Sequence, residues 1–247
     1  MKLSAIILTK DGNDLKFKKA VESVSFADEV IVVKEKFPIQ DFSEVRNRAL
    51  DRVRGEWVMF VDSDEIVTAE LKEEILYRFR IPSTTLRASM SGMTGYKLRR
   101  RDGFLGKWLR YGETAGVRLL RLAKKDAGQW VRPVHEVWKI NGKIGELKNP
   151  LLHYSHDSVE EMVEKIDIYS GIEAEYRSKK QVNRLSGYQV ITEMILFPVG
   201  KFIQNYILRL GFLDGMEGFI HAGMMSFHSF LVRAKLLTRC ESTNTSE

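Results

Sequence analysis

The sequence predicts an α/β protein with a mostly parallel sheet, helices on both faces of that sheet, and a helical extension after it. Three observations carry this prediction. The first eighty residues alternate between short apolar runs and stretches with apolar residues every three or four positions. The 247 residues, 44% hydrophobic and 29% charged, suit a globular chain with one large domain and an appendage. After Pro150 the pattern is helical.

The predicted strands of the first part are three short apolar runs, at 3–9, 29–33 and 57–61. Between them, residues 13–25 and 42–53 carry apolar side chains at helical spacing. Thr68 can cap a third helix, whose first turns hold three glutamates where the helix dipole favours acids. Strands that alternate with helices in this way predict parallel pairing, with helices on both faces.

The middle of the chain, 84–150, is rich in glycine and arginine, and its short apolar runs predict strands or loops that complete the sheet. A capping box at Ser158 predicts the start of the helical part. Two further apolar helices are expected, at 186–210 and 216–237, the first kinked at Pro198.

We therefore divide the chain into an α/β domain over 1–155, a helical extension over 156–240 and a disordered tail over 241–247. Aromatic and basic residues interleave through 186–237, which suits a helix lying in the plane of an anionic bilayer. The alternatives are a contact in a homo-oligomer and packing against the α/β domain.

Composition excludes several classes of protein. One cysteine, Cys240, excludes an internal disulfide framework and a Cys-based zinc site. The apolar run at 3–8 is too short for a signal peptide, and no run of about 18 apolar residues predicts a transmembrane helix. The net charge of +6 indicates an anionic partner: nucleic acid, a phosphate-bearing metabolite or an acidic membrane surface.

Two carboxylates, Asp62 and Asp64, follow the third predicted strand. Ligands of open α/β sheets lie beyond the carboxyl ends of the strands. One carboxylate can bind Mg²⁺ or Mn²⁺ while the other orients a ribose or a water, and the ion would neutralise charge on a departing diphosphate. The alternative is an acidic turn that caps the next helix.

Several segments together resemble a known family. The runs "LSAIILTKDG", "SFADEVIVV" and "RNRALDRVRGEWVMFVDSDEIV" resemble glycosyltransferase family 2. The runs "VHEVW", "GKIGELKNPLLHYS" and "YILRLGFLDGMEGF" resemble its lipopolysaccharide-core branch, related to the WaaE/KdtX glucosyltransferases. The resemblance spans about residues 3–237. It implies a GT-A fold for 1–155, a nucleotide-sugar donor, a divalent cation and inversion at the anomeric carbon.

The resemblance also assigns donor-binding residues. Thr9, Lys10 and Asp11, at the end of the first strand, match positions that line the nucleotide pocket. Arg46 and Asn47, in "EVRNRAL", match a family position near the donor.

Catalytic and metal-binding roles fall on four further positions. Asp62 and Asp64 match the Asp-x-Asp metal motif, with Asp64 as the more direct ligand and Asp62 also near the donor. Glu136 matches the position of the general base, which takes the proton of the acceptor hydroxyl. His135 beside it could serve the metal or the diphosphate. The plainer alternatives are a surface acid at Glu136 and an ordinary hydrogen-bonding histidine at His135.

One departure from the family pattern follows the second strand. Family members carry an Asp-rich turn there, whereas this chain has "KEKFPI" at 34–39, with Glu35 as the one acid. Two alternatives follow: Glu35 substitutes for the missing aspartate, or the donor nucleotide is held differently. A degenerate, non-catalytic nucleotide-sugar-binding protein therefore stays an alternative. A nucleotidyltransferase is another, although "TKDGNDLKFKK" matches its phosphate loop poorly.

The positive charge is concentrated in 97–132, where eleven basic residues stand against three acidic ones, a net +8. This segment suits a phosphorylated or acidic acceptor and the donor diphosphate. A solvated basic surface is the alternative, and the absence of a helix-turn-helix, zinc-finger or RNA-binding signature argues against nucleic acid. The sequence thus predicts a transferase using a nucleotide-sugar, most readily a UDP-sugar, at the cytoplasmic face of the inner membrane.

Overall fold

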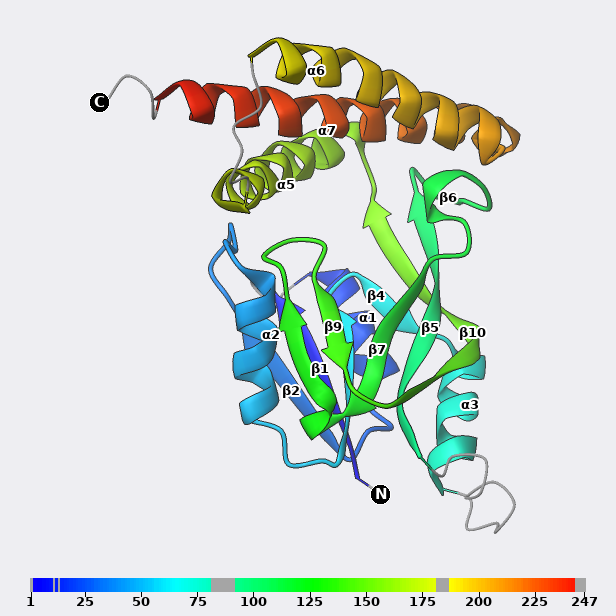
Figure 1. Ribbon diagram of the computed structural model, residues 1–247. Helices are drawn as coiled ribbons and strands as arrows, with labels where there is room; N and C mark the ends of the chain where they lie inside the picture. Colours follow the sequence, from blue (N-terminus) through cyan, green and yellow to red (C-terminus); the bar gives the residue numbers. More distant parts are fainter. Residues whose placement is uncertain (1, 11, 13, 81–91, 181–186, 243–247) are drawn as a thin grey trace. The chain divides into compact units, whose positions relative to one another are not determined.

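The structure is a computed structural model that describes residues 2–242 except 11, 13, 81–91 and 181–186 (Figure 1). The chain forms two compact units. The first unit comprises 1–102 and 116–155, and the second comprises 103–115 and 156–247. Residues 103–115, placed by the sequence analysis in the α/β domain, therefore pack with the C-terminal helices instead.

Eight strands form one sheet: β1 (Leu3–Thr9), β2 (Glu29–Lys34), β3 (Trp57–Asp62), β4 (Glu65–Val67), β5 (Met93–Phe104), β6 (Lys107–Trp108), β7 (Arg118–Lys124) and β10 (Lys143–His156). Their order is β2-β1-β3-β7-β5-β10-β4, with β6 paired to β5. A separate two-stranded sheet pairs β8 (Gly128–Val131) with β9 (Val137–Ile140).

The α/β class is confirmed, but the expectation of a mostly parallel sheet is corrected: the sheet is mixed. β1 is parallel to both β2 and β3. β7 is antiparallel to both β3 and β5, and β10 is antiparallel to β4. Parallel neighbours need a long crossover, usually a helix. From β5 to β10 the connections are turns and two short 3-10 segments, η1 (Gly112–Thr114) and η2 (Lys125–Ala127), which suit antiparallel pairing.

Three helices belong to the first unit: α1 (Leu15–Ser23), α2 (Phe42–Asp51) and α3 (Ala69–Arg80). Each begins at a side-chain cap. Asp14 accepts a hydrogen bond from the Phe17 N–H, and Asp41 accepts one from the Glu44 N–H. The predicted cap of α3 is confirmed, because the Thr68 hydroxyl accepts a hydrogen bond from the backbone N–H of Leu71.

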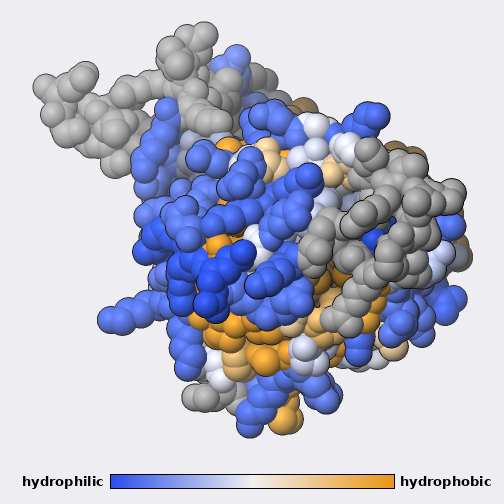
Figure 2. Space-filling model, turned by 90° about the horizontal axis from the view of Figure 1, so that it is seen from below, coloured by the Kyte–Doolittle hydropathy of each residue, from blue (hydrophilic) through white to orange (hydrophobic). Residues whose placement is uncertain are grey.

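The side chains of β1 alternate between two hydrophobic cores. Ala5 and Ile7 pack in a core that includes Leu71 of α3. Ile6 packs on the opposite face, in a core that includes Val45 of α2. The prediction of helices on both faces is therefore confirmed. On the surface seen in Figure 2, hydrophilic residues surround a smaller hydrophobic area.

The second unit is helical. Its elements are α5 (Val159–Lys180), α6 (Gly187–Phe202), the π-helical turn η3 (Ile203–Leu208), the 3-10 turn η4 (Gly211–Asp214) and α7 (Gly215–Ser242). The helix α7 packs against both α5 and α6 (Figure 1). The expected helical extension is thus confirmed. Pro198 lies inside α6, which continues to Phe202.

The start of α5 is fixed by a reciprocal pair of hydrogen bonds. The Ser158 hydroxyl accepts from the Glu161 N–H, and the Glu161 carboxylate accepts from the Asp157 N–H. This agrees with the capping box predicted there. Among the described residues, no helix is both long and apolar enough to cross a membrane.

Candidate active site

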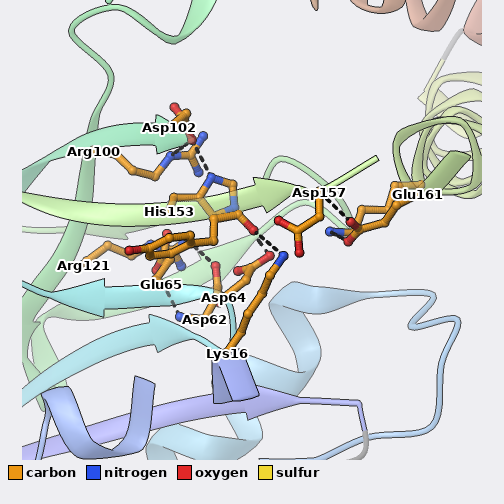
Figure 3. Close-up of polar contacts among 12 residues, drawn as sticks. Lys16, Asp62, Asp64, Glu65, Arg100, Asp102, Arg121, His153, Asp157 and Glu161 are labelled. Carbon is orange, nitrogen blue, oxygen red and sulfur yellow. Dashed lines mark hydrogen bonds and ion pairs between the residues drawn. The ribbon is translucent and has the colours of Figure 1, made fainter. Parts of the chain in front are cut away.

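The carboxylates of the Asp-x-Asp motif lie on a tight turn between β3 and β4. The Asp62 N–H donates to Oε2 of Glu65 at 3.0 Å, and the Tyr154 N–H donates to the carbonyl oxygen of Asp64 at 2.8 Å. These bonds close the turn and tie it to β10. Both carboxylates therefore stand at the carboxyl end of a central strand (Figure 3).

Arg46 of α2 joins this turn to the predicted base. Its side chain is 2% exposed, and its Nη2 lies 2.7 Å from Oδ1 of Asp62. The same arginine contacts Oε1 of Glu136, at 2.9 Å from Nε and 2.8 Å from Nη2. Its guanidinium also lies over the ring of Trp130, 4.7 Å from the centroid. One buried side chain thus fixes the distance between the motif and Glu136.

Arg121 of β7 holds the other oxygen of the same aspartate. Its Nη2 lies 2.5 Å from Oδ2 of Asp62 and 3.5 Å from Oε1 of Glu65. Burial by itself would raise the pKa of Asp62, but the charges of Arg121 and Arg46 lower that pKa well below its usual value. Burial raises the pKa of Glu65 despite the opposing charge of Arg121. Asp62 is therefore an ionised carboxylate held by two arginines.

His153 of β10 lies between two other carboxylates (Figure 3). Its Nε2 is 3.6 Å from Oδ2 of Asp64, and its Nδ1 is hydrogen-bonded to Oδ1 of Asp102. Arg100 pairs with Asp102 in turn, at 2.9 Å. Burial would lower the pKa of His153, but the charge of Asp64 and the hydrogen bonds to Asp102 and Asp64 raise it to about 9. This histidine faces Asp64 because β10 pairs with β4, which places His153 opposite Glu65.

The predicted nucleotide-binding residues lie at the end of β1. The hydroxyl of Thr9, which is buried, accepts a hydrogen bond from the Gly12 N–H at 3.1 Å. The ammonium of Lys10 lies 5.2 Å from the centroid of the Phe37 ring. Asp11 falls outside the described residues. The positions beside β1 thus keep Lys10 at the surface and use Thr9 to shape the turn.

Asn47 and His135 have structural roles in and around the β8–β9 hairpin. The Asn47 side chain donates to the Trp130 carbonyl at 3.0 Å and accepts from the Trp130 N–H at 2.9 Å. Both ends of that amide therefore hold β8 against α2. His135 is exposed and has a φ of +51°, so it occupies the left-handed conformation of a turn just before β9.

The three predicted metal ligands Asp62, Asp64 and His135 do not gather into one group. Over the residues that the structure describes, no cluster of three or more His, Cys, Asp or Glu side chains could hold an ion. Both oxygens of Asp62 contact arginines instead. Asp64 and, once an ion displaces its Nε2 proton, His153 would offer a carboxylate and an imidazole side by side. Two protein ligands fit an ion whose remaining positions are filled by substrate phosphates and water.

The sequence analysis missed Arg121, His153 and Asp102. Arg121 lies inside the apolar run "RLLRLAK", and an arginine inside a buried strand requires a carboxylate partner. His153 similarly interrupts "PLLHYS", which offers a weaker signal because an isolated histidine is common in cores. Asp102 carries no local signal, since its contact with His153 depends on how the strands are arranged.

The basic segment 97–132 is divided between the two units. At least five of its eleven basic residues pair with carboxylates: Arg100, Lys107, Arg118, Arg121 and Lys124. Much of its charge is therefore balanced within the protein. A cavity of about 630 Å³ lies beside α3 and is lined by Glu70, Glu73 and Asn149, among others. None of its lining residues is among those that contact Asp62.

Comparison with known proteins identifies relatives of the chain. A family model described as "Glycosyl transferase family 2" matches residues 3–127, about half of the chain. An uncharacterized glycosyltransferase of Rickettsia typhi is 25% identical over 264 residues, covering 95% of this chain and 86% of the relative. One from Rickettsia conorii is 27% identical over 270 residues, covering 95% and 89%.

Solved structures also show similarity. Staphylococcus aureus TarS 1–349 is 13% identical, with a TM-score of 0.41. The superposition covers 100% of this chain and 92% of TarS 1–349. The same protein in complex with UDP-GlcNAc is 11% identical, with a TM-score of 0.41, and covers 96% and 89%.

Proposed function

Because the chain belongs to glycosyltransferase family 2, we propose that it is an inverting, metal-dependent transferase. It moves a sugar from a nucleotide-sugar donor, a UDP-sugar first among the candidates, to a hydroxyl of a cell-envelope glycan. The observation that carries this proposal is the bridge made by Arg46, which links Asp62 at the end of β3 to Glu136. Such strand ends are where open α/β sheets bind their ligands.

Glu136 is the proposed general base. Both contacts of Arg46 engage its Oε1, and the side chain is 15% exposed. Its Oε2 would take the proton of the acceptor hydroxyl as that oxygen bonds to the anomeric carbon and the bond from this carbon to the donor diphosphate breaks. One displacement of this kind inverts the configuration of the sugar. Arg46 keeps the base in place without occupying the oxygen that receives the proton.

Asp64 and His153 are the residues that would hold the cation. Here His153 takes the role that the sequence analysis gave to His135. When bound, a divalent ion supplies positive charge next to the leaving diphosphate. Asp102 fixes the imidazole by its contact to Nδ1, so that Nε2 points toward Asp64. Asp62 keeps Arg46 and Arg121 in position rather than binding the ion directly.

The acceptor is proposed to be a phosphorylated or acidic glycan or lipid-linked glycan, as in the lipopolysaccharide-core branch. Two features support this. The runs around Glu136 and His153 resemble that branch. Lys97 and Arg99 of β5 are exposed, and guanidinium and ammonium groups bind phosphate oxygens.

The test measures transfer and donor hydrolysis with UDP-, GDP-, ADP- and dTDP-sugars, with Mn²⁺ or Mg²⁺ present. Glu136→Gln should lower turnover by roughly 10²- to 10⁴-fold with donor binding retained. Asp64→Ala and His153→Ala should raise the Mn²⁺ concentration needed, whereas the matched variant His135→Ala should not. If Asp64→Ala and Glu136→Gln both leave transfer intact, this mechanism is wrong. NMR of the product's anomeric configuration tests inversion.

A non-catalytic nucleotide-sugar-binding protein is the second candidate. Glu35, the one acid in the turn after β2, pairs with Arg48 at 2.9 Å. It is therefore engaged by α2 rather than replacing the aspartate of the family's turn. Calorimetry with the same donor panel distinguishes the two candidates, because donor binding without turnover of any donor would favour this second function.

A further inference from the structure

The helix α6 in the second unit exposes its apolar side. Five aliphatic residues at every fourth position, from α6 into η3, are 41–61% exposed: Ile191, Ile195, Val199, Ile203 and Ile207. Residues four apart lie on one face of a helix. They form a continuous strip on the surface, which we call the apolar stripe. A surface helix of a soluble protein normally points such a stripe toward the core.

Three polar side chains of the same helical segment, Glu193, Lys201 and Asn205, point the other way. Glu193 lies 3.7 Å from Arg233 of α7. Asn205 is 1% exposed and donates to Glu113 at 3.0 Å, and Lys201 pairs with the same carboxylate at 2.7 Å. These three groups thus contact neighbouring elements, while the aliphatic groups of the stripe contact the solvent. Burying polar groups costs free energy, and so does leaving apolar groups in water. This arrangement therefore indicates that the apolar side contacts another surface.

The apolar surface extends past the end of α6. Further exposed apolar residues lie on η3, η4 and the start of α7: Leu208, Phe212, Leu213, Met216 and Phe219. Phe219 lies against Phe202 and Tyr206, which places the first turns of α7 beside the end of α6. Fifteen of the exposed large hydrophobic residues fall between 191 and 230. A surface of this kind marks an interaction site.

Two cations at this end of the second unit are exposed, and the acids beside them are paired. Arg110 and Arg209 are exposed. Asp214 is buried and accepts hydrogen bonds from the N–H groups of Arg110 and Tyr111. From 187 to 217 the sequence has three acidic residues, Glu193, Asp214 and Glu217, which contact Arg233, backbone N–H groups and Lys107 respectively. The apolar surface is therefore bordered by positive charge.

We propose that the apolar stripe, together with η3 and η4, is the face on which the protein lies on an anionic lipid bilayer, with α6 in the membrane plane. Aliphatic and aromatic side chains would enter the headgroup boundary, and Arg110 and Arg209 would contact lipid phosphates. Of the described helices, none is long and apolar enough to cross a membrane, which fits a helix that lies on the surface.

A second copy of the chain suits this face less well. A two-fold contact would bring the same surface of both copies together. Such a contact would include Arg110 and Arg209 of both copies, whereas the acids of 187–217 are already paired within each copy. Phosphate headgroups provide the missing negative charge. The charge pattern thus favours a bilayer as the occupant.

The first experiment is co-sedimentation with phosphatidylcholine vesicles, with and without phosphatidylglycerol. The stripe variant carries Ile195→Ser, Ile203→Ser and Ile207→Ser. The matched control carries Leu15→Ser, Val30→Ser and Ile144→Ser, three apolar residues of the first unit that are 73%, 37% and 42% exposed. The wild type and the control should bind anionic vesicles, and the stripe variant should bind about tenfold more weakly or worse.

A second measurement does not depend on the triple variant folding. In a Cys240→Ser background, a single cysteine is placed at Ile195 or at Glu164, an exposed residue of α5. Each cysteine carries a polarity-sensitive dye. Anionic vesicles should shift the emission of the dye at 195 to shorter wavelength and leave the dye at 164 unchanged.

Three results would overturn the proposal. The wild type could fail to bind anionic vesicles, the stripe variant could bind as the wild type does, or the dye at 195 could report no change. A wild-type dimer that becomes monomeric in the stripe variant, without vesicle binding, would assign the face to a second copy instead. Donor hydrolysis in solution should be the same in the wild type and the stripe variant, so failure here is separable from failure of the proposed reaction.

Discussion

The two units of the molecule differ in how many partners their inward-facing charged side chains contact. In the first unit, Arg46 and Arg121 each contact two carboxylates, and Asp62 is shared by both. In the second unit, the charges of α6 meet one carboxylate or one arginine each, as Lys201 meets Glu113. The shared network fixes several groups relative to one another, as a reaction site requires. The separate pairs serve only to orient a helix. Ion pairs directed inward therefore indicate function only when their partners are shared.

The largest effect expected from this difference is that of Arg46→Leu. The substitution leaves Asp62 and Glu136 without their common cation, so the free energy of unfolding should fall by about 3–5 kcal/mol in urea denaturation. The control is Arg48→Leu, two residues further along the same helix, where a 59% exposed arginine pairs with Glu35. That variant should lose about 1 kcal/mol or less. Equal losses in the two variants would contradict a shared network.

A smaller effect is expected from pH through His153. Its pKa of about 9 in the folded protein lies above the ordinary value of 6.5. The stabilisation from its pairing is therefore complete below pH 6.5 and is lost as the pH rises through 9. Without divalent cations, the free energy of unfolding should fall over this range by at most about 3 kcal/mol. Urea denaturation at several pH values measures the fall.

The variant His153→Gln serves as the control for that measurement. Glutamine does not titrate in this range, so the decrease in stability between pH 6.5 and 9 should become shallower. An unchanged pH dependence would show that the decrease has another source than the contacts of His153 with Asp64 and Asp102.

The smallest effect is expected in the second unit. Glu113→Gln removes the charge opposite Lys201, and both side chains are about 30% exposed. The free energy of unfolding should fall by about 1 kcal/mol or less, and vesicle binding should not change, because the apolar stripe is intact. If Glu113→Gln lowered the free energy of unfolding as much as Arg46→Leu does, the proposed difference between the two units would be wrong.

The sequence predicted those features that depend on residues close together in the chain. The strands β1 to β3, the helices between them and the caps at Thr68 and Ser158 follow from local spacing and residue type. The antiparallel half of the sheet did not follow, because short apolar runs do not specify their partners. Contacts such as His153 with Asp64 depend on the pairing of β10 with β4, so the sequence indicated the motif but not its surroundings.

The direction of α6 illustrates a different limit. The sequence predicts an apolar helix over 186–210, and α6 lies within that range. Periodicity does not say whether the apolar side of a helix faces the protein or the solvent. The answer depends on where Glu113 and Arg233 lie, since they receive the polar side chains of α6.

The contacts between α2 and the two-stranded ribbon of β8 and β9 have a consequence for protein engineering. Arg46 and Asn47 are adjacent in sequence, and they hold Glu136 and Trp130, one on each side of the ribbon's turn. A residue inserted between Arg46 and Asn47 would rotate one of these contacts by about 100° relative to the other and misplace the base. A longer turn after β9, at Gly142, would leave both contacts in place. Because that turn lies at the opposite end of β9 from Glu136, an insertion there should leave the base in place.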